Sequence, residues 1–259
     1  MNRPIVFLTD FGLKDHYAGI LKGVALSVHP GAVLIDLCHE IEPQNVIQAA
    51  TLLEISYRYF PKGSIFVCVV DPGVGTARKI LCVRTRDYLF LAPDNGLLAP
   101  VLKKIGYYEV REVENKKYFL GGASNTFHGR DILMPVAAHL ARKNIFRFLG
   151  KILKTVKPLS IPPIRKGRLM IEGEILYFDR FGNAFTNLRQ TDAAAGFWNK
   201  ARIKAGSLDL GGLRKTYGDG SRSLCALFSS FGQLELALPN GNAQIVYKLC
   251  AGQKVSATL

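Results

Sequence analysis

The first 145 residues alternate between short apolar runs and longer stretches whose apolar residues recur at helical spacing. The apolar run 5–8 precedes helical spacing over 17–28, and an extended segment 32–38 follows. A second helical stretch, 46–59, leads into the most continuous apolar run, 64–70. Further strands are expected at 80–83, 88–91 and 107–113, and a further helix through 132–140. This alternation predicts an α/β domain with a largely parallel sheet, because parallel strands need crossover connections that are usually helical.

The pattern changes at residues 157–167, where three prolines fall within six residues. Such a segment is typical of a linker. Beyond it, short apolar runs are separated by turn signals such as Phe181-Gly182-Asn183 and Gly218-Asp219-Gly220, which is typical of an all-β sandwich or small barrel. We therefore predict an N-terminal α/β domain at 1–160 and a smaller C-terminal β-barrel domain at 161–259.

The chain carries 34 Lys and Arg against 20 Asp and Glu, a net charge of +14. The interval 142–168 is rich in basic residues and has no acidic residue, as expected of a surface that binds nucleic acid. Apolar residues at helical spacing within 145–156 favour a second interpretation, the solvated basic face of a packed helix.

Membrane insertion and secretion find no support in the sequence. The longest apolar runs have about six residues, whereas a transmembrane helix needs about 20. The N-terminus has no signal-peptide pattern, so we expect a cytoplasmic protein. The five cysteines form no CxxC pair, and three of them lie in apolar runs, which predicts buried, inert thiols.

Asp10 lies in the loop Thr9-Asp10-Phe11-Gly12, directly after the first predicted strand. Ligands of open α/β sheets bind at the carboxyl ends of strands, where such a carboxylate can accept hydrogen bonds from both ribose hydroxyls. An Asx turn, or a cap for the helix that Tyr17 opens, explains the same residue equally well.

A second loop, 71–78, follows the most apolar strand and contains two glycines without the GK[ST] ending of a P-loop. Its ends, Asp71 and Arg78, can form an ion pair. Such a pair serves either an ionised carboxylate that orients water or a purely structural loop closure.

A third loop ends in His128-Gly129-Arg130-Asp131 just before a helix. A helix N-terminus would lower the pKa of His128. Taken alone, this histidine fits a structural role better than a catalytic one. A metal-dependent hydrolase using Asp10, Asp71 and His128 is a further reading, but the fixed ligand spacing of a metal site is missing.

Several motifs together resemble one known family. They are TDFG (9–12), CHEIEP (38–43), DPGVGT (71–76), APDNGLL (92–98), TFHGRD (126–131), FDRFGNAFTN (178–187) and LELALPNGNA (234–243). In this order they follow the pattern of the S-adenosyl-L-methionine (SAM) hydrolases, also called SAM hydroxide adenosyltransferases, which are homologous to the SAM-dependent fluorinase and chlorinase. The resemblance covers residues 5 to about 247, and the pair DPGVGT and TFHGRD is its specific part.

The resemblance implies metal-independent displacement at C5′ of SAM by water, giving adenosine and L-methionine, with SAM as substrate and no separate cofactor. It assigns the water nucleophile to Asp71, Arg78 and His128, the ribose diol to Asp10, and a pocket wall to Phe127. A loop of the C-terminal domain with Asp179, Phe181 and Asn183 would meet the methionine end and the adenine. The last strands would complete that pocket with Ser230, Asn242 and Ala243. A homotrimer with active sites between subunits is also implied.

Within this superfamily the halogenases lack the Asp and His of this set, so Asp71 and His128 favour hydrolysis over halide transfer. Gln44 stands where relatives often carry an aromatic residue. A nucleic-acid-binding module that uses the interval 142–168 remains the alternative from a different class, and it predicts salt-sensitive binding without turnover of SAM.

Overall fold

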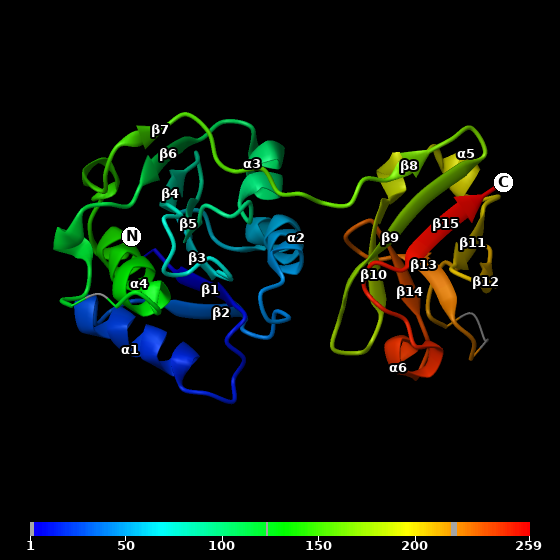
Figure 1. Ribbon diagram of the computed structural model, residues 1–259, viewed down its shortest axis with the longest axis horizontal. Coiled ribbons are helices and arrows are strands. Elements are labelled where there is room, and N and C mark those ends of the chain that lie inside the picture. Colours follow the sequence, from blue (N-terminus) through cyan, green and yellow to red (C-terminus); the bar gives the residue numbers. More distant parts are fainter. Residues whose placement is uncertain (1–2, 123, 219–221) are drawn as a thin grey trace. The chain divides into compact units, whose positions relative to one another are not determined.

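The computed structural model describes residues 3–122, 124–218 and 222–259 (Figure 1). The chain divides into two compact units, Met1–Ser160 and Ile161–Leu259. Among the described residues, no helix combines the length and apolar character needed to cross a membrane.

The first unit contains a seven-stranded sheet in the order β2-β1-β3-β5-β4-β6-β7. Its strands are β1 (Ile5–Thr9), β2 (Leu34–Cys38), β3 (Ile65–Val69), β4 (Ile80–Arg84), β5 (Leu89–Pro93), β6 (Glu109–Glu112) and β7 (Ile152–Leu153). Strands β2, β1, β3 and β5 are mutually parallel, whereas β4, β6 and β7 join by antiparallel pairing. The predicted α/β fold is confirmed. Strand β4 runs antiparallel to β5 because the connection between Arg84 and Leu89 is too short for a crossover.

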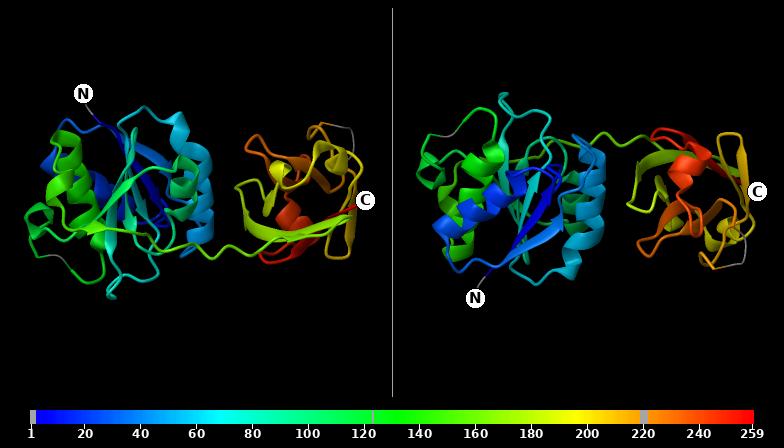
Figure 2. Two further views of the ribbon diagram at one scale, coloured as in Figure 1. Left: turned by 90° about the horizontal axis from the view of Figure 1, so that it is seen from above. Right: turned by 90° about the horizontal axis from the view of Figure 1, so that it is seen from below.

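Helices cover both faces of this sheet (Figure 2). On one face α1 (Tyr17–Val28) and α4 (Met134–Arg142) share a core with alternate side chains of the central strands. On the other face α2 (Val46–Ser56) and α3 (Ala99–Ile105) bury the opposite set. Shorter helical turns are η1 (Tyr57–Tyr59), η2 (Lys116–Tyr118), the π-helical η3 (Gly129–Leu133) and η4 (Phe146–Phe148). The two cores hold the sheet rigidly between the helix layers, so the loops at its edges have a fixed base.

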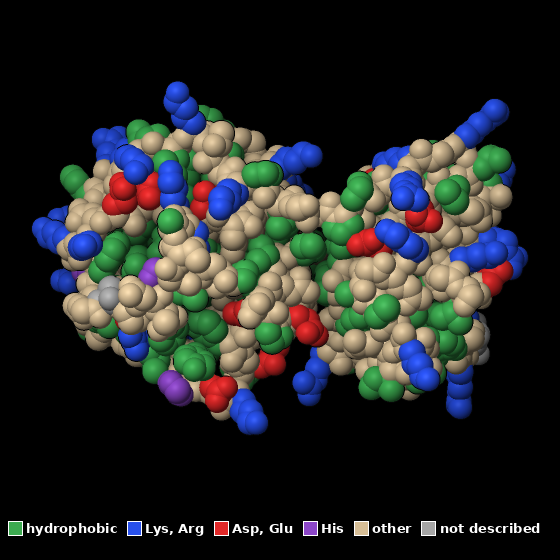
Figure 3. All heavy atoms as spheres, viewed as in Figure 1, with side chains coloured by type: hydrophobic (Ala, Val, Ile, Leu, Met, Phe, Trp, Pro, Cys, Tyr) green, Lys and Arg blue, Asp and Glu red, His purple; other side chains and the backbone are tan. Residues whose placement is uncertain are grey.

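The expectation of a packed basic helix over 145–156 is wrong. The segment contains only η4 and the short strand β7. Gly150 lies against the sheet edge so closely that a Cβ would stand 2.3 Å from the carbonyl oxygen of Glu112, and the Glu112 N–H donates to the Lys151 carbonyl at 3.0 Å. Sheet pairing with β6 therefore takes the backbone groups that a helix would need. On the face that Figure 3 shows, basic side chains are spread over both units.

The second unit is a nearly closed antiparallel barrel in the order β12-β11-β15-β9-β10-β14-β13, with β8 paired to β9. Its strands are β8 (Arg165–Lys166), β9 (Met170–Phe178), β10 (Ala184–Arg189), β11 (Arg202–Ala205), β12 (Leu208–Gly211), β13 (Cys225–Phe228), β14 (Gln233–Ala237) and β15 (Lys254–Thr258), accompanied by η5 (Gln190–Asp192), α5 (Ala195–Trp198) and α6 (Ala243–Tyr247). Inward side chains of these strands form its core. The predicted all-β architecture is confirmed, with two short helices added.

The cysteines follow the expected pattern in part. Cys68, Cys82 and Cys225 are buried, whereas Cys38 is half-buried and Cys250 is exposed, and none of these five described residues is in a disulfide. Burial raises the pKa of Cys68 and Cys82, which keeps both thiols protonated and unreactive.

Candidate functional site

A cavity of about 260 Å³ lies where β1 and β3 end. Its lining residues are Asp10, Phe11, Gln44, Val69, Asp71, Pro72, Val74, Thr126, Phe127, His128 and Gly129. The parallel strands carry Asp10 and Asp71 to one edge of the sheet, as expected for ligand sites in such sheets. The fold thus brings four residues proposed from the sequence, Asp10, Asp71, Phe127 and His128, to one cavity.

Arg78 closes the second loop onto Asp71. Its Nε donates to both carboxylate oxygens, at 2.8 and 2.7 Å, and its Nη2 also donates to Oδ2. Each of the two side chains is only 6% exposed. Because the guanidinium carries a fixed charge and presents a planar fork of donors, this geometry holds Asp71 as an ionised carboxylate.

Glycine is required in this loop. Gly75 has a φ of +81°, and a Cβ there would stand 2.9 Å from the backbone oxygen of Asn125. The absence of a side chain lets the loop 71–78 lie directly against the segment that carries His128. The two loops therefore form one packed assembly.

Arg78 also reaches His128, with Nη2 at 2.9 Å from Nδ1. A guanidinium can only donate hydrogen bonds, so Nδ1 is the acceptor and the ring proton of a neutral His128 resides on Nε2. Burial and the neighbouring Arg78 lower the pKa of His128. The lowered pKa agrees with the expectation, but its named causes are burial and Arg78, whereas the sequence suggested a helix terminus.

Asp131 anchors the loop that carries His128. This residue was not singled out from the sequence. It is 1% exposed, and its carboxylate accepts from Ser124 N at 2.8 Å, Ser124 Oγ at 2.7 Å and Arg130 Nε at 2.6 Å. Burial alone would raise the pKa of Asp131, but the hydrogen bonds from Arg130 and Ser124 outweigh burial and lower it. Asp131 therefore pins the loop as a buried, ionised anchor.

Asp10 does not cap the following helix. Its Oδ2 accepts instead from the backbone N–H of Gln44, at 2.8 Å, and His16, the N-cap residue of α1, makes no side-chain capping hydrogen bond. Gln44 adopts a φ of +65°, which is unusual for a residue with a side chain and aims its N–H at Asp10. Burial raises the pKa of Asp10, against the lowering effect of the Gln44 hydrogen bond.

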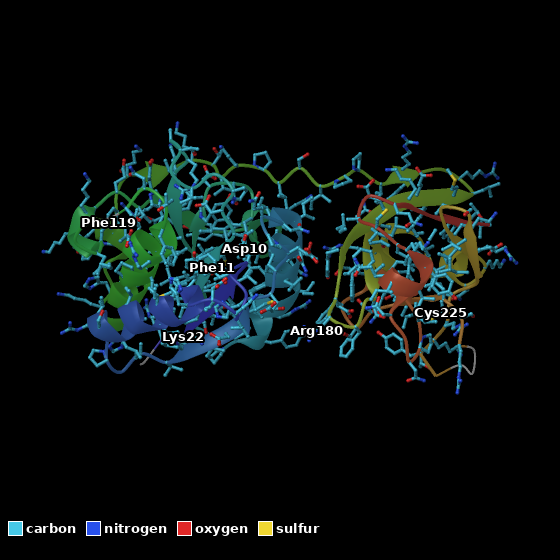
Figure 4. The ribbon with its side chains drawn as sticks, turned by 60° about the horizontal axis from the view of Figure 1, so that its bottom comes forward. Asp10, Phe11, Lys22, Phe119, Arg180 and Cys225 are labelled. Atoms are coloured by element: carbon cyan, nitrogen blue, oxygen red, sulfur yellow. The ribbon has the colours of Figure 1, made fainter. Side chains whose placement is uncertain are left out.

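Aromatic rings close one side of the cavity. Phe11, Tyr17 and Phe127 are mutual neighbours, with ring centroids 5.5 to 5.7 Å apart. The Arg130 guanidinium lies 5.1 Å from the centre of the Phe127 ring. Figure 4 labels Asp10 and Phe11, which stand side by side after β1. A carboxylate next to an apolar wall suits a ligand that carries hydroxyl groups as well as a flat ring.

The second unit has its own cavity, of about 600 Å³. Its lining residues are Asp179, Phe181, Asn183, Tyr217, Gly218, Leu238, Pro239, Asn240 and Gly241. Asp179 accepts from the backbone N–H groups of Phe181 and Asn183, both at 2.9 Å, and from Asn183 Nδ2 at 3.0 Å. These bonds shape the turn, and Phe181 is left 74% exposed at the rim.

The other three residues proposed for this region lie outside that lining. Asn242 caps α6 by accepting from Ile245 N at 2.8 Å, and Ala243 is buried in the barrel core. Ser230 is exposed in the turn between β13 and β14. Asn242 nevertheless packs on the Asp179 loop, because a Cβ on Gly182 would stand 2.2 Å from its side chain.

Two residues of this region, Tyr217 and Glu235, were not predicted from the sequence. The Tyr217 hydroxyl donates to Glu235 Oε1 at 2.7 Å, and Glu235 is 1% exposed on β14. Burial raises the pKa of Glu235. The sequence does carry a signal for Glu235. A glutamate within an apolar strand such as β14 is expected to be buried, and a buried carboxylate needs a hydrogen-bond partner.

No group of three His, Cys, Asp or Glu side chains in the described part of the chain is arranged to hold a metal ion. The hypothesis of a metal-dependent hydrolase named Asp10, Asp71 and His128, and these residues are therefore not such a group. Both carboxylate oxygens of Asp71 accept hydrogen bonds from Arg78.

Family models and known proteins match nearly the whole chain. The model of the SAM hydroxide adenosyltransferase N-terminal domain matches residues 5–150, and that of the C-terminal domain matches 173–256. The (R)-S-adenosyl-L-methionine hydrolase of Thermus thermophilus is 35% identical, with 98% of each chain covered. A fluorinase of an Actinoplanes species is 28% identical over 99% of this chain and 98% of its own.

A solved structure agrees with these matches. An uncharacterised conserved protein from Thermotoga maritima superposes with a TM-score of 0.88 at 36% identity, covering 98% of this chain and all of that one. Both domain models, the full-length relatives and the fold thus agree. The chain belongs to the SAM hydroxide adenosyltransferase family.

Proposed function

We propose that this protein hydrolyses SAM to adenosine and L-methionine by attack of water on C5′. The observation that carries the proposal is that Arg78 joins Asp71 to His128, and that both of these residues line the same cavity as Asp10. Membership of the family and the relatives named (R)-S-adenosyl-L-methionine hydrolase support the substrate.

The chemistry requires positioning more than acid catalysis. The C5′–S bond breaks with its electron pair moving to sulfur, so a neutral thioether leaves and needs no proton. The C5′–O bond forms from water, which must lie in line with the leaving sulfur. The ionised Asp71 accepts a hydrogen bond from that water, and Nε2–H of His128 is the donor left free by Arg78 to hold its oxygen. The proton lost from water passes to Asp71 or to solvent.

The remaining site residues have binding roles in this proposal. The Asp10 carboxylate accepts hydrogen bonds from both ribose hydroxyls, and Phe127 contributes to the apolar wall of the cavity. From the second unit, Asp179, Phe181 and Asn183 contact the methionine end and the adenine, and the loops with Ser230, Asn242 and Ala243 complete that pocket. The reaction uses SAM as substrate and requires no separate cofactor.

We also propose that the protein is a homotrimer in the cytoplasm, with each site formed from the first unit of one subunit and the second unit of its neighbour. The five cysteines, all described and none in a disulfide, support a reducing compartment. Light scattering coupled to gel filtration tests the trimer, and cell fractionation tests the location.

The decisive experiment incubates EDTA-treated protein with SAM in oxygen-18 water and identifies the products by mass spectrometry. Labelled adenosine with unlabelled methionine is expected. Intact SAM, from protein shown to be folded, would overturn the proposal. Parallel reactions with fluoride or chloride test halide transfer, because 5′-halo-5′-deoxyadenosine would then appear.

A further inference from the structure

A buried polar network lies beneath the Asp10 loop and has no part in the proposed chemistry. Thr9, the last residue of β1, is fully buried, and its Oγ1 lies 2.8 Å from Nδ1 of His39. The other ring nitrogen, Nε2, is 3.1 Å from Asp36 Oδ1, on an oblique approach that makes it an electrostatic contact instead of a straight hydrogen bond. The His39 side chain is only 1% exposed.

The outer end of the network reaches the surface of the first unit. Asp36 Oδ2 accepts from Lys22 Nζ at 2.7 Å, and Figure 4 labels Lys22 on α1. Burial would raise the pKa of Asp36, but the Lys22 hydrogen bond and the contact with His39 outweigh burial and lower it. Asp36 is therefore an ionised carboxylate next to the ring.

Counting donors and acceptors gives the network one direction. Asp36 is a carboxylate that only accepts, so the ring proton of a neutral His39 resides on Nε2, which faces it, and Nδ1 is left as an acceptor. The Thr9 hydroxyl, 2.8 Å away, then donates to Nδ1, while its oxygen accepts from Phe11 N at 3.3 Å. Each group has a defined role, so the network fixes the Thr9 rotamer and the Phe11 N–H that flanks Asp10.

The backbone ties the same two loops together. Gly12 N donates to the His39 carbonyl at 2.7 Å, and Ile41 N donates to the Thr9 carbonyl at 3.4 Å. The Asp10 carboxylate is held by Gln44 N from the same neighbouring loop. Within the described residues, the contact between Thr9 and His39 is the one buried side-chain hydrogen bond that joins the Asp10 loop to its neighbour.

We propose that His39 is a positioning residue for ribose recognition: held by Asp36, it fixes Thr9 and thereby aims the Asp10 carboxylate at the ribose diol of the substrate. The inference rests on the proposed function, which assigns Asp10 to the ribose. It places the selectivity for a ribose diol partly in residues that never touch the ligand.

The test measures binding of adenosine and of 3′-deoxyadenosine to the full-length protein by calorimetry. The wild type is expected to prefer adenosine by about tenfold or more, the range for a hydrogen bond to a charged group. Thr9→Val, which keeps the shape but removes the hydroxyl, is expected to lose most of that preference while binding 3′-deoxyadenosine almost as before. The matched control is Thr51→Val, which removes a partly buried hydroxyl bonded to the Ile47 carbonyl on α2.

His39 is tested by a disruptive and a conservative substitution. His39→Ala is expected to abolish the preference, whereas His39→Gln is expected to restore it in part, because an amide can accept from Thr9 and donate toward Asp36. Asp36→Asn, at the partly exposed end of the network, provides a milder variant should His39→Ala fail to fold.

The outcomes separate this proposal from the proposed function. Variants that keep the wild-type preference, or that lose affinity for both nucleosides equally, would show a merely structural network and overturn the positioning role. A wild type that hydrolyses SAM but does not discriminate between the nucleosides overturns the positioning role alone. A wild type that neither binds adenosine nor turns over SAM overturns both.

Discussion

Arg78 and His128, fifty residues apart in the sequence, meet nitrogen to nitrogen, with Nη2 at 2.9 Å from Nδ1. Because arginine only donates, this contact determines where the histidine proton resides: His128 is neutral, with its proton on Nε2. The same guanidinium binds Asp71. One side chain thus sets both the charge of the carboxylate and the tautomer of the imidazole.

Replacing this arginine by lysine should disable the site although the charge is kept. A lysine carries a single compact ammonium group, so it cannot donate to both Asp71 oxygens and to His128 at the same time. We expect Arg78→Lys to lower kcat for SAM hydrolysis by about 100-fold, the cost of slight misplacement of reacting groups. The control is Arg84→Lys, in an ion pair with Glu109 at the other end of β4, which should keep near-normal kcat. Equal activity of both variants would contradict the role of Arg78.

Asp71→Asn and His128→Ala should each remove most turnover and leave SAM binding nearly intact. Each substitution removes a group that holds the water, which corresponds to about 10²–10⁴-fold in kcat. Steady-state kinetics and calorimetric binding of SAM separate the two effects. Full activity in either variant removes that residue from the mechanism.

The pH dependence should report His128. Because burial and Arg78 lower its pKa below the ordinary 6.5, the neutral ring persists as the pH falls through that value, and kcat should decline only at lower pH. Between the lowered pKa and 6.5 the unfolded chain binds a proton that the folded chain does not, so stability falls with the pH across this window. Long-range proton–nitrogen NMR of the ring measures both the pKa and the tautomer. A proton on Nδ1 at neutral pH would contradict the Arg78 contact.

The turn of the second unit depends on a glycine. Gly182 has a φ of +82°, and a Cβ would meet the Asn242 side chain at 2.2 Å. We expect Gly182→Ala to displace Asn242 from the end of α6 and to destabilise the unit by about 1–3 kcal/mol. Thermal unfolding measures the loss. Gly196→Ala, in α5 where a Cβ would meet nothing within 4 Å, is the control and should melt at or slightly above the wild-type temperature.

Most of the fold could be predicted because helix and strand periodicities are local. Helical spacing over 17–28 coincides with α1, and the run 64–70 contains β3. The helix prediction for 145–156 was wrong because the apolar spacing there suits a helix, whereas Gly150 and the free edge of β6 favour sheet pairing. A free strand edge belongs to the assembled sheet and has no signature in the segment that pairs with it.

The sequence by itself determined the loops that carry the chemistry, since an acidic or histidine residue directly after a strand or before a helix is visible as a pattern. Only the tertiary structure decided which of those side chains touch. His39 and Asp131 offered no signal of their own, yet burial gives each a fixed set of partners. The physical reason is that a buried polar group must find its hydrogen bonds among whatever the fold places beside it, and those neighbours come from distant parts of the chain.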